Sequence, residues 1–327
     1  MPGIMVHYFC GDYAAKLFDN DIIDIISRHR QEYSLGTQGP DNFFYYPQFF
    51  AEKSAKGIGT RMHKESIGAF FRCMAERAKE LPADDRAPAA SYLCGFIMHY
   101  AMDTNAHPYV YYKTGFLRKG EYGGMKYSAA HRRFETALDV KMLEYLENKK
   151  PSDVKIFELL ELEKQAGMAV SSFIGSCINS VYGTNISDRA VYESFIHMKR
   201  ITRMLQSGKG RKKRFIEFIE RATVRQRLIS SMVHSEEYND GIDYLNMRRA
   251  KWCYPWDASE ELTLTFPEIF GRAVGDGVLM VNRLGAYLRG EISIDELMKV
   301  IGDRSFLSGL DSSDTQEFVC FETVFTD

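Results

Sequence analysis

Residues 88–105 read PAASYLCGFIMHYAMDTN, a strongly apolar stretch with few charged side chains. The stretch does not alternate polar and apolar residues, as a half-buried strand would. Apolar residues spaced three and four positions apart recur along much of the remaining chain. We therefore predict a helix here and an all-α fold, because no part of the sequence shows sustained alternation between hairpin turns.

The same periodicity predicts further helices and the loops between them. Helices are expected at 12–32, 64–80, 128–149, 153–182, 187–206, 211–236 and 264–288. A last short helix begins at Ser293, where Glu296 completes a capping box. Glycines predict loops at 35–40, 114–126 and 207–210. We expect one multi-helix domain over residues 1–304 and a polar C-terminal tail over residues 305–327.

Composition limits the classes of partner. The 327-residue chain is 45% hydrophobic and carries a formal net charge of -2, so no global field draws it onto nucleic acid or an anionic membrane. No apolar run reaches about eighteen residues, which argues against stable membrane insertion. The N-terminal sequence MPGIMVHYFCGDYAAK lacks the features of a secretory leader, so we predict a cytoplasmic protein.

The six cysteines are widely separated and form no CxxC pair. In a reducing compartment, such residues are usually buried thiols, not disulfides or zinc ligands.

Histidines and carboxylates share helix faces in two places. His99, Asp103 and His107 are each four residues apart, so they lie on one face of a helix that Pro108 is expected to end. His131 and Glu135 repeat the four-residue spacing beside the buried stripe of the next helix.

Burying such groups without partners would be costly, and a divalent cation removes that cost. A single pair with this spacing is usually a hydrogen bond, but two pairs on apolar helices favour a metal site. Mixed nitrogen and oxygen donors without thiolate suit catalytic zinc. Two neighbouring ions suit hydrolysis of a phosphate ester.

Four segments resemble the bacterial zinc-dependent phospholipase C family, which is similar in fold to the fungal single-strand nucleases. They are Gly39-Pro40-Asp41, Met62-His63, residues 95–108 and His131-Arg-Arg-Phe-Glu135. The resemblance covers roughly residues 1–140.

The resemblance implies a role for each matching residue. It gives a first zinc ion to Asp41, His63, His99 and Asp103, and a second to His107, His131 and Glu135. It gives a third to His7 and the bridging carboxylate of Asp103. Asp41 would also orient or deprotonate the attacking water. In secreted members the N-terminal residue completes the third site, whereas His7 here follows six residues, so we expect two or three Zn²⁺ ions.

Other motifs have less specific interpretations. The aromatic residues Phe43, Phe44, Tyr45, Tyr46, Phe49 and Phe50 follow Asp41 and could wall a substrate pocket or pack on the core. The basic run 209–214 is typical of a solvated helix start, although it could contact phosphate. The aromatic turn at 252–256 could lie near the site or serve packing. His29, His197 and His234 are expected to be surface or hydrogen-bonded residues.

These observations predict a zinc-dependent phosphoesterase that hydrolyses a phosphodiester with metal-activated water. Its expected substrate is a phospholipid headgroup or a small phosphate ester. A nuclease or nucleotidase acting on single-stranded nucleic acid is the alternative. A metal-binding protein without catalytic turnover is a third possibility.

Overall fold

The computed structural model describes residues 3–45, 57–116, 124–223, 229–236, 238, 241–314 and 316–325. Helices dominate it, which confirms the all-α prediction, and the described residues contain one small sheet. The helical elements are α1 (Ile4–Ala14), α2 (Asn20–Arg28), α3 (Arg30–Gly36), η1 (Gly39–Phe44), α4 (Ile58–Met62), α5 (Ile67–Glu80), α6 (Ala83–Thr114), α7 (Gly124–Glu147), η3 (Ile156–Leu160), α8 (Lys164–Tyr182), α9 (Asp188–Leu205), α10 (Arg211–Thr223), η4 (Ser230–Met232), α11 (Phe266–Arg289) and α12 (Ile294–Ile301). The strands are β1 (Trp252–Tyr254) and β2 (Asp257–Leu262).

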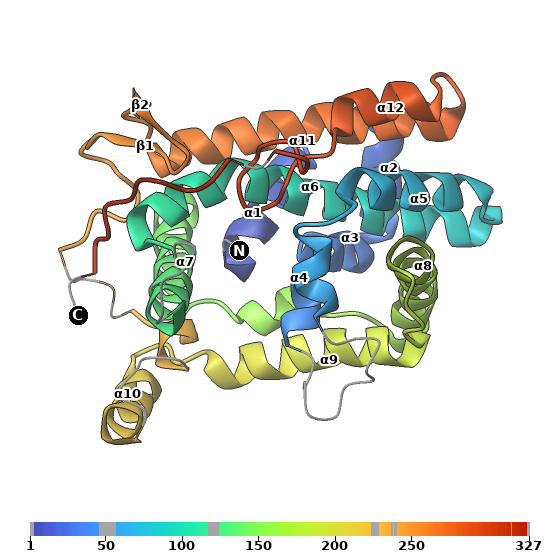
Figure 1. Ribbon diagram of the computed structural model, residues 1–327. Coiled ribbons are helices and arrows are strands. Elements are labelled where there is room, and N and C mark those ends of the chain that lie inside the picture. The colour runs from blue at the N-terminus through green and yellow to red at the C-terminus, as the bar shows by residue number, and fades with distance from the viewer. Residues whose placement is uncertain are drawn as a thin grey trace.

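Helix α6 is the centre of the molecule. It is 32 residues long, and nearly every side chain from Ala89 to Val110 is buried. A helix that is apolar on all sides belongs in a core surrounded by other elements. Helix α11 runs along α6 (Figure 1), while α1, α3, α5, α7 and α8 contact it from other sides.

Helices α3 and α6 cross at backbone contact. A Cβ atom added to Gly36 would lie 2.2 Å from the carbonyl oxygen of Tyr92, and one added to Gly95 would lie 2.2 Å from that of Tyr33. Only glycine permits this approach. The crossing brings the turn after α3 against the middle of α6, where His99 lies.

The N-terminal helices differ from the prediction. The expected single helix over 12–32 is wrong, because α1 begins at Ile4 and the chain turns before α2 and again at His29. Helix α1 is apolar on nearly all sides and buried, so it shows no polar face that periodicity could detect. Leu17, expected in an apolar stripe, is exposed in the turn.

The sequence predicted that this helix ends at Pro108, and that prediction was wrong. The helix continues to Thr114, although a proline inside a helix removes a hydrogen bond at a cost of about 3 kcal/mol. The residues on either side of Pro108 are buried against neighbouring elements, and this tertiary packing outweighs the local penalty. The face that carries His99 and Asp103 therefore extends through His107.

The aromatic turn at 252–256 is a hairpin. Strands β1 and β2 pair antiparallel, with an irregularity after Cys253. No alternation in the sequence indicated this hairpin, because β2 is exposed along most of its length. The predicted helix over 211–236 is α10 followed by η4, and the residues between them lie outside the described part.

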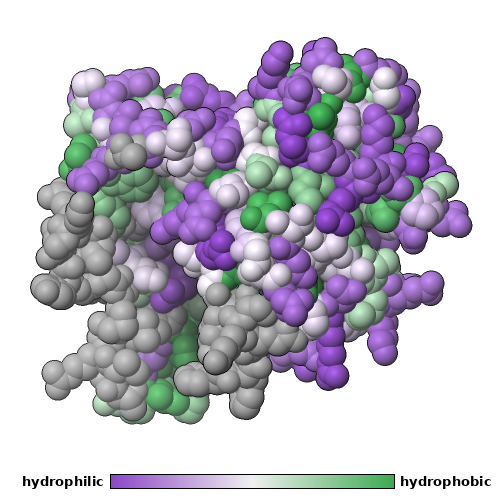
Figure 2. All heavy atoms as spheres, turned by 45° about the vertical axis from the view of Figure 1, so that its right-hand side comes forward, coloured by the Kyte–Doolittle hydropathy of each residue, from purple (hydrophilic) through white to green (hydrophobic). Residues whose placement is uncertain are grey.

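The described residues on one face of the molecule are mainly polar. Hydrophilic residues cover most of the face in Figure 2, with hydrophobic ones in small groups. Among the described helices, none combines the length and hydropathy needed to cross a bilayer.

Candidate metal centre

Five of the predicted ligands come together beside the middle of α6, and we call them the inner group: His7, Asp41, His63, His99 and Asp103. They arrive from four places in the chain: α1, η1, the end of α4 and α6. All five residues are buried, with at most 4% of their surface exposed. The fold thus brings these five residues together from distant parts of the chain.

Asp103 lies at the centre of the inner group. Its Oδ1 atom is 3.3 Å from Nε2 of His7, and its Oδ2 atom is 3.2 Å from Nε2 of His99. Asp41 completes the group, with Oδ1 at 3.2 Å from Nε2 of His63 and 3.8 Å from Nε2 of His99. The rings of His7 and His99 stack with centroids 3.9 Å apart.

Backbone carbonyl groups fix the orientation of three histidines. The Nδ1 atom of His63 lies 2.6 Å from the carbonyl oxygen of Gly59, and that of His99 lies 3.1 Å from Thr37. The Nδ1 atom of His107 lies 2.6 Å from the carbonyl oxygen of Phe306. A ring that donates from Nδ1 to a carbonyl turns the lone pair of Nε2 toward the ligands, as metal-binding histidines generally do.

Several polar atoms of the inner group are buried without a hydrogen bond. Within the described residues these are both ring nitrogens of His7, Nε2 of His99 and both carboxylate oxygens of Asp103. Leaving such atoms unsatisfied would destabilise the fold by about 1–3 kcal/mol each. A cation shared by these atoms would satisfy them, so the donor set fits a metal.

Burial gives the histidines the protonation state that metal binding needs. It is the main reason that the pKa of His7 falls to about 4, with the nearby His99 adding to the shift. Burial likewise lowers the pKa of His63 to about 4. Both rings are therefore neutral near pH 7, with a lone pair available for a cation.

The two carboxyl groups of the centre differ. Burial raises the pKa of Asp41 to about 8. Burial alone would also raise the pKa of Asp103, but the charges of His107 and His99 hold it well below its usual range. Asp103 is therefore the fixed negative charge of the inner group.

The remaining three predicted ligands form a second cluster, which we call the outer group: His107, His131 and Glu135. Oε1 of Glu135 lies 2.7 Å from Nε2 of His131 and 3.8 Å from Nε2 of His107. Burial would raise the pKa of Glu135, but His131 lowers it to about 2, so the group carries a negative charge. Asp103 links the two groups, since its Oδ1 atom is 3.6 Å from the ring of His107.

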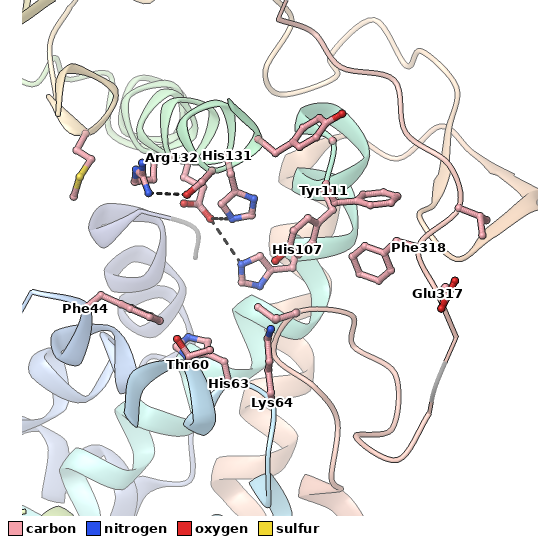
Figure 3. A pocket seen from close by; sticks show the side chains of 18 of the residues that line it. Phe44, Thr60, His63, Lys64, His107, Tyr111, His131, Arg132, Glu317 and Phe318 are labelled. Atoms are coloured by element: carbon pink, nitrogen blue, oxygen red, sulfur yellow. Dashed lines mark hydrogen bonds and ion pairs between the residues drawn. The ribbon is translucent and has the colours of Figure 1, made fainter. Parts of the chain in front are cut away.

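A cavity of about 1240 Å³ opens over the outer group. His63, His107, His131 and Glu135 line it, together with two cations, Lys64 and Arg132. Figure 3 shows Lys64 near His63 and Arg132 near His131. Its other walls are aromatic: Phe44, Tyr45, Tyr111, Phe116, Tyr127 and Phe318. The cavity therefore joins metal donors, local positive charge and flat apolar surface.

The less specific sequence features have mixed outcomes. Phe44 and Tyr45 line the cavity and Phe43 is buried, whereas Tyr46, Phe49 and Phe50 lie outside the described residues. The basic run 209–214 leads into α10 and does not line the cavity. Four of its cationic side chains are exposed, as a solvated helix start would be, whereas Lys213 is buried with Nζ 3.7 Å from the ring centroid of Tyr238. Trp256 of the hairpin packs on Phe318, with ring centroids 5.9 Å apart.

The remaining histidines and the cysteines behave largely as expected. His234 pairs with the buried Asp139 at 2.7 Å, and His29 lies 3.3 Å from Glu32. All six cysteines are free thiols, four of them buried and two, Cys73 and Cys320, partly exposed.

The sequence interpretation missed several parts of the site. Lys64 and Arg132 directly follow predicted ligands, and that adjacency was a usable signal. Phe306 gave no signal, because its part in the site is a backbone carbonyl that every residue possesses. Its segment was expected to be a tail, yet Phe306 is buried with its ring centroid 5.1 Å from that of His63.

The fold is all-helical and gathers histidine, aspartate and glutamate in groups that could hold metal ions. These features place the chain in the class of helical proteins with a candidate metal centre. Residues 6–184, more than half of the chain, match the family model described as zinc dependent phospholipase C. The chain belongs to this family. Neither a curated protein nor a solved structure matches it. Family and donor groups together support a zinc-dependent phosphoesterase.

Proposed function

We propose that this protein hydrolyses phosphodiesters of the phospholipase C type, with two or three zinc ions held by the inner and outer groups. One observation carries the proposal: eight nitrogen and oxygen donors converge, with buried atoms unsatisfied, beside a large cavity that also contains two cations. The family supports zinc as the ion.

Asp41, His63, His99 and Asp103 would hold one ion, and His107, His131 and Glu135 another. His7, beside Asp103, would serve a third. When bound, such ions neutralise charge on phosphate oxygens and make water a better nucleophile at neutral pH. Asp41 keeps its proposed second role of orienting or deprotonating the attacking water, since its carboxyl group lies next to His63 at the cavity.

Lys64 and Arg132 would bind the phosphate oxygens that face away from the ions. Nη1 of Arg132 donates to Ser128 at 2.8 Å, while its Nε atom is buried without a hydrogen bond to any described residue. Arg132 is thus anchored to its own helix through Ser128, and its Nε atom remains as a donor for a phosphate oxygen. A charge-assisted bond from such a donor contributes roughly 1.5–3 kcal/mol.

The aromatic walls favour a substrate with an apolar or flat group next to the phosphate. A phospholipid fits this description, because apolar acyl chains are attached to the glycerol beside its phosphate, and it is the substrate class that the family suggests. Stacking of nucleobases on Tyr111 or Phe318 would instead support a single-strand nuclease.

The proposal can be tested with bis-(p-nitrophenyl) phosphate, using zinc-loaded protein, EDTA-treated protein and a His99→Ala variant. We expect turnover only in the loaded wild type. His197→Ala is the matched control, because this half-buried histidine on α9 is not among the residues that line the cavity, and it should keep full activity. Activity that survives both EDTA and His99→Ala would remove the proposed mechanism.

Substrate classes are separated by offering phosphatidylcholine and single-stranded RNA to the same preparation. Release of phosphocholine supports the phospholipase C assignment, and release of nucleotides supports the nuclease. If zinc raises the Tm while every ester stays intact, the cluster serves stability alone.

A further inference from the structure

Cys253 and Cys320 form a thiol pair outside the metal groups. Their Sγ atoms lie 2.8 Å apart, although 67 positions separate them in the sequence. Cys253 belongs to β1 and is 9% exposed, while Cys320 lies in the C-terminal segment, residues 316–325, and is more exposed. Neither residue lines the cavity or belongs to the inner or outer group.

Backbone hydrogen bonds hold the two cysteines in register. The amides of Val319 and Cys320 both donate to the carbonyl oxygen of Pro255, at 2.6 and 3.1 Å. The thiol of Cys320 donates to the carbonyl oxygen of Tyr254 at 3.3 Å. A disulfide requires sulfur atoms at about 2.05 Å and backbones held close together. This pair needs only a short approach of two side chains.

The C-terminal segment is also a wall of the cavity, to which it contributes Glu317, Phe318 and Val319. The ring of Phe318 packs against Tyr111, with centroids 5.1 Å apart, and Tyr111 packs against His131 at 4.9 Å. A covalent bond at Cys320 would therefore hold the chain two residues from Phe318, which contacts His131 of the outer group through Tyr111.

We propose that Cys253 and Cys320 are a redox-modified site, at which a small disulfide such as oxidised glutathione forms an intramolecular bond that fixes this wall of the cavity. The deprotonated thiol of Cys320, the more exposed partner, attacks one sulfur of the oxidant and releases one glutathione. The thiol of Cys253 loses its proton to solvent and attacks the mixed disulfide, which releases the second. Two protein thiols are oxidised, and one glutathione disulfide is reduced to two thiols.

The order of attack follows from the environment of the thiols. Burial, together with the hydrogen bond to Cys320, raises the pKa of Cys253 to about 12, so Cys253 is a poor first nucleophile. Once Cys320 carries the mixed disulfide, the proximity of Cys253 makes the second step intramolecular.

The test uses the full-length protein, reduced, desalted and then exposed to oxidised glutathione. Of the six cysteines, four should remain titratable in denaturant after oxidation. Peptide mapping by mass spectrometry should find the lost pair joined between positions 253 and 320. Cys253→Ser and Cys320→Ser should each abolish the joined peptides.

Cys177→Ser is the matched control, because Cys177 and Cys73 are another pair of interacting thiols in the chain. This variant should keep the 253–320 bond. Six unchanged thiols, glutathione adducts alone, or a bond confined to positions 73 and 177 would each overturn the proposal.

Hydrogen exchange then tests the effect on the wall. Amides of residues 316–325 should exchange about tenfold more slowly in oxidised than in reduced protein, because opening of the segment is restricted. The Cys320→Ser variant should show no such difference. Equal exchange rates in the oxidised and reduced wild type would contradict fixation of the wall. Neither measurement requires the protein to be a hydrolase.

Discussion

The inner and outer groups both combine histidines with carboxylates, but the fold assembles them differently. The outer group comes from two helices, and its shortest contact joins residues four apart on α7. The inner group draws on α1, η1, the end of α4 and α6, and the separation along the chain reaches 96 positions between His7 and Asp103. All three residues of the outer group line the cavity, whereas His63 is the one residue of the inner group that does so.

This difference indicates that the two groups would have different roles within the proposed centre. The inner group is buried, so its ions would be held tightly and would set the electrostatic field. The outer group lies at the cavity, so its ion would meet the substrate. Asp103 is the connection, because its carboxylate approaches histidines of both groups.

The largest effect is expected from Asp103→Asn, which would break both groups at once. The amide keeps the shape but removes the charge that His7 and His99 face, so zinc content should fall at every site. Loss of metal stabilisation worth several kcal/mol lowers turnover by about 10³-fold or more. Zinc is measured by elemental analysis, and turnover with bis-(p-nitrophenyl) phosphate.

Asp139→Asn is the matched control for that variant. Asp139 is also fully buried and also pairs with a histidine, His234, but it lies in neither group. It should lose stability and keep its zinc. Equal zinc loss in both variants would mean that Asp103 has no special role as a link.

A smaller effect is expected from His131→Ala, which would break the outer group alone. One ion should be lost per chain while the inner ions stay, and turnover should fall by about 10²- to 10³-fold. The comparison is sharpened by counting zinc in this variant and in His99→Ala, where the inner ion is lost. If His131→Ala empties the whole centre, the two groups are one cooperative unit.

A smaller effect still is expected from Gly39→Ala, which removes no ligand. Gly39 has φ +50°, and a Cβ atom there would lie 2.3 Å from Cδ2 of His99, so the ring must shift. Displacing a ligand without deleting it typically lowers metal affinity or activity by about 10- to 100-fold. Zinc titration measures the change. Gly271→Ala, where the added methyl group meets nothing within 4 Å, should be silent.

The two groups also differ in how far the sequence alone predicts them. The contact between His131 and Glu135 follows from their spacing on one helix, as does the alignment of His99, Asp103 and His107. Such local geometry depends only on the helical repeat. The helices themselves were predictable where one face is polar, as in α5, α7 and α11.

The approach of His7, Asp41 and His63 to His99 and Asp103 was not predictable from local pattern. The place of His7 came from the family resemblance, because α1 is buried on nearly all sides and gives no periodic signal. The carbonyl groups of Thr37, Gly59 and Phe306 orient three histidines, but only the tertiary fold brings those carbonyls to the rings. The Gly36–Gly95 crossing likewise depends on two helices that are distant in the sequence.

The smallest effect expected is a pH dependence of stability in the metal-free protein. His7 and His63 have a folded pKa of about 4 against about 6.5 unfolded, so the unfolded chain binds protons first as the pH falls. Stability from these two groups is therefore lost from pH 6.5 down to pH 4. Asp41 has a folded pKa of about 8 against about 3.9 unfolded, so its contribution is lost as the pH rises toward 8.

Between pH 4 and 6.5 the two histidines outweigh Asp41. The hydrogen bond from Cys177 lowers the pKa of Cys73 to about 6, which would oppose Asp41 at higher pH, so the measurement is made in a Cys73→Ser background, where the slope above pH 6.5 comes from Asp41. The Tm of EDTA-treated protein should thus peak near pH 6.5 and fall by a few degrees toward pH 8, as a loss of roughly 1–2 kcal/mol implies. The alkaline decline reports the inner group, since the pKa of Glu135 lies far below this range. Asp41→Asn should abolish that decline, and zinc should abolish it too, because a cation stabilises the ionised carboxylate. A decline that persists in Asp41→Asn would place its origin outside the inner group.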